Sequence, residues 1–378
     1  MSGSQSTCRT LGRMVAAVLA GGLLASTALG TLTIHLTLPQ GLPPGVPPAA
    51  YGGAMAVDPL APVPVEMQIW AVVTDGNGDM SDDGLSKFYS AFYSSLGGVV
   101  LGDLMASPAM EAYPSHGPYW FGGEAASLGD QADLDGDGDL DIGSTDVEEP
   151  SPPWFQIRHA AGMQFSDEVW ILKWQPMPGN PINAWHVADV TFTPTVAGPE
   201  FDPTGPSGIT EIWADPRQYA AAQWTEDGLS KINYLEGSGE ENRGILEGGE
   251  KVVLYVASHA EAPSGGGPFV VVQGGPALIL EGTASTGSVN WWGWDFDGDG
   301  TYEIEGIGQS AVEVSYDDLK AMGLEDMVPY TAMMTVGWSQ SPVINTDTVA
   351  FDLTIIPEPA TLALLLGGCL ITRVRRRR

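Results

Sequence analysis

Glycine and proline are so frequent in this chain that long helices are excluded from most of it. The 378 residues include 49 glycines and 29 prolines, about one residue in five. Glycine weakens helix interiors and proline breaks them. The runs between these breaks are short and mix β-branched, aromatic and polar residues, which is typical of strands. The clearest of them are 66–73, 169–174, 188–194 and 251–257. The pattern predicts an all-β protein.

One segment, 83–96, fits two structures. Its apolar side chains at 85, 88, 89, 92, 93 and 96 follow a helical stripe. Asp82 or Asp83 would cap its start, and Gly97-Gly98 would end it. Against a helix, Gly84 would lie in the first turn, and serine and aromatic residues are mediocre helix formers. We retain both interpretations, a helix and a pair of strands.

The N-terminus has the three parts of a secretory signal. Arg9 and Arg13 form a basic region, an apolar run follows over 14–29, and small residues occupy 28 and 30. A retained anchor is the alternative. Because the apolar run is short for a membrane span and contains two glycines, we predict that 1–30 is a cleaved signal peptide.

The C-terminus carries a second signal with three parts in order. These are a Pro-Glu-Pro tripeptide, an apolar run over 360–372 and a basic end, with the defining residues Pro357, Glu358, Pro359, Arg373, Arg375, Arg376, Arg377 and Arg378. The segment 357–378 resembles a PEP-CTERM sorting signal. The resemblance implies an exported protein of a Gram-negative bacterium, processed by an exosortase-type membrane peptidase and often associated with extracellular polysaccharide.

The apolar run of this signal is short. Thirteen residues separate the tripeptide from Arg373, whereas a helix that crosses the hydrocarbon needs about twenty. Arginines hold such a segment on the cytoplasmic side. We therefore expect 360–372 to contact the membrane only transiently, with a simple tail anchor as the alternative.

The part between the two signals is acidic and free of thiols. Cys8 and Cys369 both lie in the signals, so 31–356 has no cysteine. This part contains eight basic and 46 acidic residues, a net charge of −38. Nucleic acids and anionic membranes would repel it, which excludes both as general partners and favours cations.

Composition divides the chain into segments. Eight prolines between 38 and 64 predict a stiff linker over 31–64, and Gly-Pro-rich residues at 261–268 predict a second linker. We expect a large β-sandwich at 65–260 and a smaller one at 269–356, with a disordered or helical signal at each terminus.

Two loops carry closely spaced carboxylates. In the first, Asp133, Asp135, Asp137, Asp139 and Asp141 occupy alternate positions. Such charges repel one another unless a cation gathers them, and Ca²⁺ prefers six to eight oxygen ligands. The loop begins like an EF-hand, but Ser144 replaces the last ligand and no helix pattern flanks it. We therefore predict a calcium turn between strands, with Asp139 contributing its main chain; a solvated acidic turn is the alternative.

The second loop contains Asp295, Asp297, Asp299 and Glu303. Its context, Trp294-Asp-Phe-Asp-Gly-Asp-Gly300 followed by Val314-Ser-Tyr316, resembles a PKD domain, an immunoglobulin-like β-sandwich of bacterial surface proteins. The resemblance covers 269–356 and departs at 317–328, which is longer and more helix-like. In that family the motif mainly shapes a strand and a turn, so metal binding here stays open.

Three tryptophans precede this loop. Strand alternation places Trp292 and Trp294 on one face, where we expect core packing, and Trp291 on the other, where an exposed ring would stack on sugars.

Motifs for catalysis are absent. There is no His-Glu-x-x-His, no Gly-x-Ser-x-Gly and no phosphate loop, and the five histidines are scattered. We expect no enzymatic activity, although a glycosidase with two distant carboxylates would leave no local motif. The predicted function is structural or adhesive, at the cell surface or in the extracellular matrix, with contacts to polysaccharide or surface proteins. The alternative is a carbohydrate-binding module.

Overall fold

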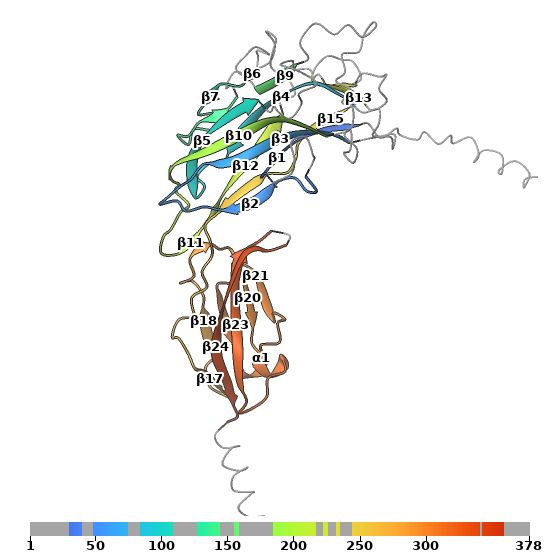
Figure 1. Ribbon diagram of the computed structural model, residues 1–378. Coiled ribbons are helices and arrows are strands. Elements are labelled where there is room, and N and C mark those ends of the chain that lie inside the picture. Colours follow the sequence, from blue (N-terminus) through green and yellow to red (C-terminus); the bar gives the residue numbers. More distant parts are fainter. Residues whose placement is uncertain are drawn as a thin grey trace, which may run out of the picture.

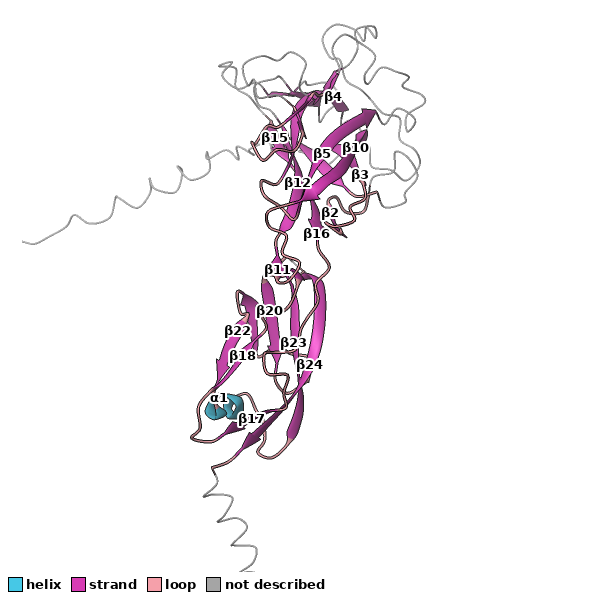
Figure 2. Cartoon of the chain, turned by 90° about the vertical axis from the view of Figure 1, so that its left-hand side faces the viewer, coloured by secondary structure: helices cyan, strands magenta, loops and turns pink. Residues whose placement is uncertain are grey.

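The computed structural model confirms an all-β protein (Figures 1 and 2). The structure describes residues 30–39, 48–74, 84–108, 127–143, 155–158, 184–216, 222–225, 232–234, 244–340 and 342–358. The predicted strand at 169–174 and nearly all of both terminal signals lie outside these residues. Within them, no helix is long and apolar enough to cross a membrane.

The strands form two domains joined end to end (Figure 1). The strands of the larger domain are β1(Thr31–Thr37), β2(Gly53–Ala56), β3(Val65–Thr74), β4(Gly84–Ser94), β5(Val100–Pro108), β6(Ser127–Leu128), β7(Gln131–Ala132), β8(Asp141–Ile142), β9(Phe155–Arg158), β10(Ala184–Ala197), β11(Pro206–Ser207), β12(Ile209–Pro216), β13(Ala222–Thr225), β14(Ile232–Tyr234), β15(Ile245–Gly248) and β16(Val252–Tyr255). The elements of the smaller domain are β17(Phe269–Val272), β18(Leu278–Glu281), β19(Gly287–Ser288), β20(Trp291–Asp295), β21(Ile304–Ile307), β22(Ala311–Val314), α1(Tyr316–Ala321), β23(Pro329–Trp338) and β24(Ile344–Ile356).

The larger domain is a sandwich of two sheets. One has the strand order β15-β1-β3-β10-β5, and the other contains β14-β13-β4-β12-β16-β2 with β6 to β9 attached beside β4. Alternate residues of the strands in both sheets point inward and form one apolar core. Trp185, Trp224 and Phe192 are among its largest buried side chains.

The N-terminal boundary predicted for this domain is wrong. We expected 31–64 to be a linker, but β1 pairs with β3 on one side and β15 on the other. Leu32, Ile34 and Leu36 are fully buried, and β2 adds an edge strand to the opposite sheet. Strands β1 and β2 therefore belong to the sandwich, and 31–64 is not a linker that precedes it.

Within the segment 83–96, residues Gly84–Ser94 form a single strand, β4, rather than a helix or two strands. Phe88 and Phe92 enter the main core, whereas Tyr89 and Ala91 pack with Tyr93 and Leu134 on the outer face. Both faces of this strand are covered, so its hydrophobic residues do not alternate with polar ones. That double burial explains the helix-like pattern in the sequence.

The smaller domain is also built from two sheets, β17-β24-β23-β20-β21 and β18-β22. Its core includes Trp292 and Trp294, as the alternation predicted. Residues 317–328, where the chain departs from the PKD pattern, include most of the helix α1. A capping box formed by Ser315 and Asp318 stabilises the first turn of this helix. Residues 261–268 contain no strand or helix, and the Ser264 N–H donates to the carbonyl of Glu281, so this segment lies along the smaller domain.

Hydrogen bonds join the domains at β11 and β19, which form a short parallel pair. The Asn345 side-chain amide donates to the carbonyls of Val256 (2.9 Å) and Ser288 (3.2 Å) and to Ser258 Oγ, and its oxygen accepts from the Ser258 N–H (2.9 Å). The Ser288 hydroxyl in turn bonds the main chain of Gly208. One side chain from β24 thus connects the last segment of the larger domain to the smaller domain.

Candidate metal centre

The first aspartate loop is the turn of a hairpin at the edge of the larger domain. It connects β7 to β8, and Ile142 in β8 pairs with Phe92 in β4. Gly136 and Gly138 have positive φ angles of 89° and 98°, which glycine adopts without strain. These two glycines let the chain fold back so that alternate carboxylates face one another.

The last two aspartates are buried. Asp139 is 1% exposed and Asp141 is fully buried. Asp139 Oδ2 accepts from Ser94 Oγ at 2.7 Å and from the Gly102 N–H at 3.0 Å. Asp141 accepts from the Ser94 N–H at 3.1 Å and from the Leu134 N–H at 3.2 Å. The loop is therefore bonded to the end of β4 and the start of β5.

Two carboxylate oxygens in this loop are buried without a partner among the described residues. They are Asp139 Oδ1 and Asp137 Oδ2. Asp137 Oδ1 accepts from the Asp139 N–H at 3.0 Å, so only the second oxygen of Asp137 lacks a partner among the described residues. A buried charged oxygen without a hydrogen bond or counter-ion is costly, and a cation at this position would remove the cost.

The electrostatics agree with this geometry. Burial raises the pKa of Asp139 to about 6, opposed by the hydrogen bonds from Gly102 and Ser94 and increased by the nearby charge of Asp137. Burial likewise raises the pKa of Asp141 to about 7, and the charges of Asp135 and Asp139 add to it. The pKa of Asp135 is also raised, first by burial and then by the charge of Asp137. Without a cation, this loop disfavours its own ionised form.

The carboxylates form two overlapping groups. Oxygens of Asp133, Asp135 and Asp137 lie within 4.8 Å of one another, and so do oxygens of Asp135, Asp139 and Asp141. Asp135 belongs to both groups and therefore links them. The expectation that Asp139 contributes its main chain stays a prediction, although an oxygen of its carboxylate also belongs to the second group. An all-oxygen donor set suits a hard cation such as Ca²⁺ or Mg²⁺.

The second loop differs because its buried carboxylate is already satisfied. Asp295 is 1% exposed, and its two oxygens accept from the N–H groups of Gly298 (2.6 Å) and Gly300 (2.9 Å). Glu303 accepts from the Phe296 N–H at 2.7 Å, and burial raises its pKa. Asp295, Asp297, Asp299 and Glu303 do place oxygens within 4.8 Å of one another. The loop has the geometry for a cation, but its hydrogen bonds already stabilise the turn.

The tryptophans before this loop do not form an exposed platform. Trp291 is 7% exposed and contacts Tyr302 edge to face, at 5.3 Å between ring centroids. An exposed Trp291 ring, which strand alternation left open, is therefore not observed. Of the predicted sorting signal, only Pro357 and Glu358 are described; Pro359, the apolar run 360–372 and Arg375 to Arg378 lie outside the described residues.

Sequence inspection missed the residues that support the first loop. Besides Ser94 and Gly102, Asp103 accepts from the Leu140 N–H at 3.1 Å. These residues lie about 40 positions before the loop, and β4 and β5 bring them to it. No local motif marks them.

The comparisons with known proteins add little. No family model matches the chain, and no curated protein is significantly similar to it. A solved structure of Drosophila OTK, extracellular domains 3–5, is 8% identical in sequence, with a TM-score of 0.18. The match covers 85% of this chain and 66% of that chain.

Proposed function

We propose that the protein is an exported surface or extracellular-matrix component with a structural or adhesive role, in which calcium stabilises the larger domain. The proposal of a calcium site rests on the burial of Asp139. Its carboxylate is nearly fully buried, and one of its oxygens has no partner among the described residues. Calcium is the favoured ion because it accepts six to eight oxygen ligands in variable geometry, whereas Mg²⁺ demands near-ideal octahedral geometry.

Calcium binding would fasten the hairpin to the sandwich. Asp139 and Asp141 reach the main chain at Ser94 and Gly102, so an ion bound by these aspartates acts on β4, β5 and β8 together. Protons would otherwise have to neutralise the buried carboxylates, and their availability falls as pH rises. An ion that replaces them keeps the loop folded at neutral pH.

The arrangement of the domains fits a C-terminal attachment. The last strand, β24, ends at Ile356, directly before the Pro-Glu-Pro tripeptide. The β17 end of the smaller domain lies opposite the larger domain (Figures 1 and 2). An anchor that follows residue 356 would therefore hold the smaller domain next to the membrane and the larger domain away from it.

Calorimetric titration of the full chain tests the calcium part. We expect calcium to bind the native chain with a stoichiometry of at least one. Asp139→Asn should lose one binding event, because it removes a central charge but keeps the size of the side chain. Asp352→Asn, the same change at an exposed carboxylate that belongs to neither aspartate loop, is the matched control for a general charge effect. Equal binding by the native chain and Asp139→Asn would refute the site.

Processing in cells tests the sorting part. In a Gram-negative host with an exosortase-type peptidase, the full chain should lose its C-terminal segment and reach the cell surface. A Pro357→Ala, Pro359→Ala double variant should keep the segment and remain in the membrane fraction. Immunoblots of cell fractions measure both results. Identical processing in a host without the peptidase would contradict the proposal.

A further inference from the structure

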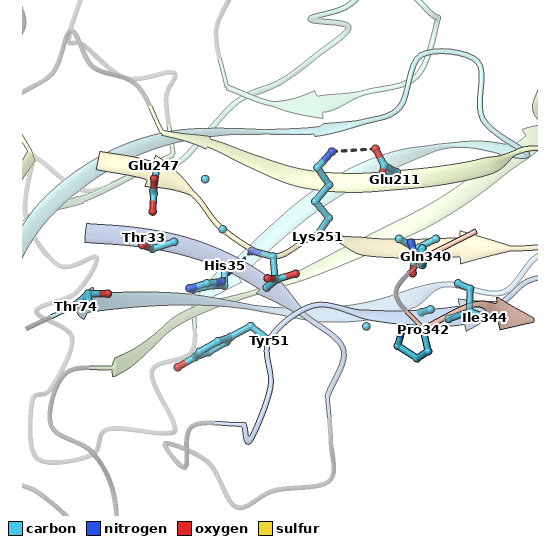
Figure 3. A pocket seen from close by; sticks show the side chains of 16 residues that line it. Thr33, His35, Tyr51, Thr74, Glu211, Glu247, Lys251, Gln340, Pro342 and Ile344 are labelled. Carbon is cyan, nitrogen blue, oxygen red and sulfur yellow. Dashed lines mark hydrogen bonds and ion pairs between the residues drawn. The ribbon is translucent and has the colours of Figure 1, made fainter. Parts of the chain in front are cut away.

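A cleft of about 1030 Å³ lies between the larger domain and the β23–β24 turn of the smaller domain. Its walls come from β1, β2, β12 and the segment after β15, and from Gln340, Pro342 and Ile344 across the junction (Figure 3). Its volume is at the upper end for small-molecule sites, which suits a ligand longer than a single ring. It is separate from the aspartate loop, since none of the five aspartates lines it.

One wall carries a rigid aromatic pair. His35 and Tyr51 stack with ring centroids 4.2 Å apart and an angle of 15° between their planes. His35 Nδ1 accepts from the Glu250 N–H at 2.9 Å. A Cβ at Gly249 would meet the His35 ring at 2.2 Å, so the main chain packs closely against that ring. Backbone contacts therefore hold the pair in place before any ligand binds.

The aromatic pair is uncharged at neutral pH. Burial lowers the pKa of His35 to about 4 and raises the pKa of Tyr51 to about 12. Because Nδ1 of His35 accepts a hydrogen bond, the neutral ring carries its proton on Nε2, which leaves a donor. The pair thus offers apolar ring surface together with neutral polar groups.

Acceptors dominate the remainder of the cleft. Glu211, Glu247 and Glu250 line it, and among the described lining residues Lys251 is the one with a basic side chain that is charged at neutral pH. Lys251 Nζ is already 3.0 Å from Glu211 Oε2, as the dashed line in Figure 3 shows. An anion would meet excess negative charge here, which excludes phosphorylated and acidic ligands. Hydroxyl and amino groups, in contrast, would donate to the carboxylates.

We propose that this cleft between the two domains binds a non-acidic glycan, with a sugar ring against the His35–Tyr51 pair and its hydroxyl or amino groups donating to Glu247 and Glu250. A sugar ring has an apolar face and a polar rim, which matches aromatic surface next to carboxylates. The inference goes beyond the proposed function because it names a ligand class and a site, and it requires no bound calcium.

Calorimetric titration with defined oligosaccharides tests the proposal. The probes are hexamers of β-1,3-glucan, β-1,4-mannan, chitosan and polygalacturonate, each added to the full chain at constant calcium. We expect binding of at least one of the first three and none of the acidic polygalacturonate. Binding of chitosan alone would assign the ligand to amino glycans, and binding of a neutral hexamer would assign it to neutral glycans. Failure of all three non-acidic probes to bind at about 1 mM, or equal binding of polygalacturonate, would overturn the proposal.

Two pairs of variants locate the site. Ala54 is exposed on β2 and lines the cleft, whereas Ala56 is exposed on the same strand but is not part of the lining. Ala54→Trp should weaken binding at least tenfold, and Ala56→Trp should leave it unchanged. Tyr51→Phe should bind within about threefold of the native chain, whereas Tyr51→Leu should lose at least tenfold. Native binding by Ala54→Trp would refute the assignment to this cleft.

The calcium-induced thermal shift, measured on the same variants, separates this inference from the proposed function. A cleft variant that loses glycan binding but keeps the calcium-induced shift supports the glycan site in the cleft. A native chain that shows the calcium-induced shift but binds no glycan refutes the glycan site and leaves the calcium proposal intact.

Discussion

Replacing Asp139 by asparagine should lower the Tm of the protein in calcium but not in chelator. With calcium, the native chain gains a free energy that depends on the ratio of ligand concentration to Kd. Calcium sites of extracellular modules have a Kd of about 10⁻⁴ to 10⁻³ M. For a Kd of about 10⁻⁴ M, about 10 mM calcium adds about 2.7 kcal/mol. For a domain of 150–250 residues this corresponds to a rise of about 5–10 °C in Tm.

Without calcium, the Asp139 carboxylate destabilises the folded state. Asp139 Oδ1 is buried and has no partner among the described residues, so its charge is unfavourable in the folded state. Asparagine removes that charge, and its side-chain oxygen can still accept from Ser94 Oγ and the Gly102 N–H as Asp139 does. In chelator at about pH 8, Asp139→Asn should therefore melt no lower than the native chain, whereas in calcium it should melt well below it.

Scanning calorimetry of the full chain in calcium and in excess chelator measures both comparisons. Asp297→Asn is the matched control, because Asp297 lies in the second loop; it should keep the calcium shift of the larger domain. The reasoning is refuted if Asp139→Asn retains the full calcium shift. It is also refuted if Asp139→Asn is strongly destabilised in chelator, since that would make the carboxylate a structural acceptor.

Three further predictions concern pH, the core and the junction. The folded-state pKa values of Asp139, about 6, and Asp141, about 7, exceed the ordinary value of 3.8, so the folded chain binds protons more tightly than the unfolded one. In chelator, the stability that these two groups contribute should be complete below about pH 4 and should be lost as pH rises through about 6 and 7. The Tm in chelator should fall over this range, and calcium should abolish the fall. A Tm in chelator that does not change with pH would contradict the prediction. Trp294→Ala should destabilise the smaller domain by about 3–5 kcal/mol in denaturant titrations, because the ring is fully buried, and a cost below about 1 kcal/mol would be inconsistent with that packing. Asn345→Ala removes the bonds of the Asn345 side chain to Val256 and Ser258 but leaves the bond between Ser288 and Gly208. It should weaken the coupling and separate the two calorimetric transitions, whereas a single unchanged transition would show that the remaining contacts couple the domains.

Local residue type was sufficient for several strands. The predicted runs 66–73 and 188–194 lie within β3 and β10, and the run 251–257 contains the shorter strand β16. It failed for β4, because burial of both faces removes the alternation. It also failed for β1, where Thr31 to Leu36 alternates as a strand should, but the prolines that follow dominated the assignment to a linker.

The sequence by itself determined the all-β class and the alternating carboxylates of 133–141, because residue spacing and Gly-Pro frequency are local properties. Only the tertiary structure decided which carboxylates are buried. Asp139 is buried because strand pairing brings Ser94 and Gly102 to it from about 40 positions away. His35 meets Glu250 for the same reason, since β1 and β15 are neighbours in one sheet although about 210 residues separate them. Alternation shows which face of a strand is apolar, but the choice of neighbouring strand depends on the packing of the whole domain.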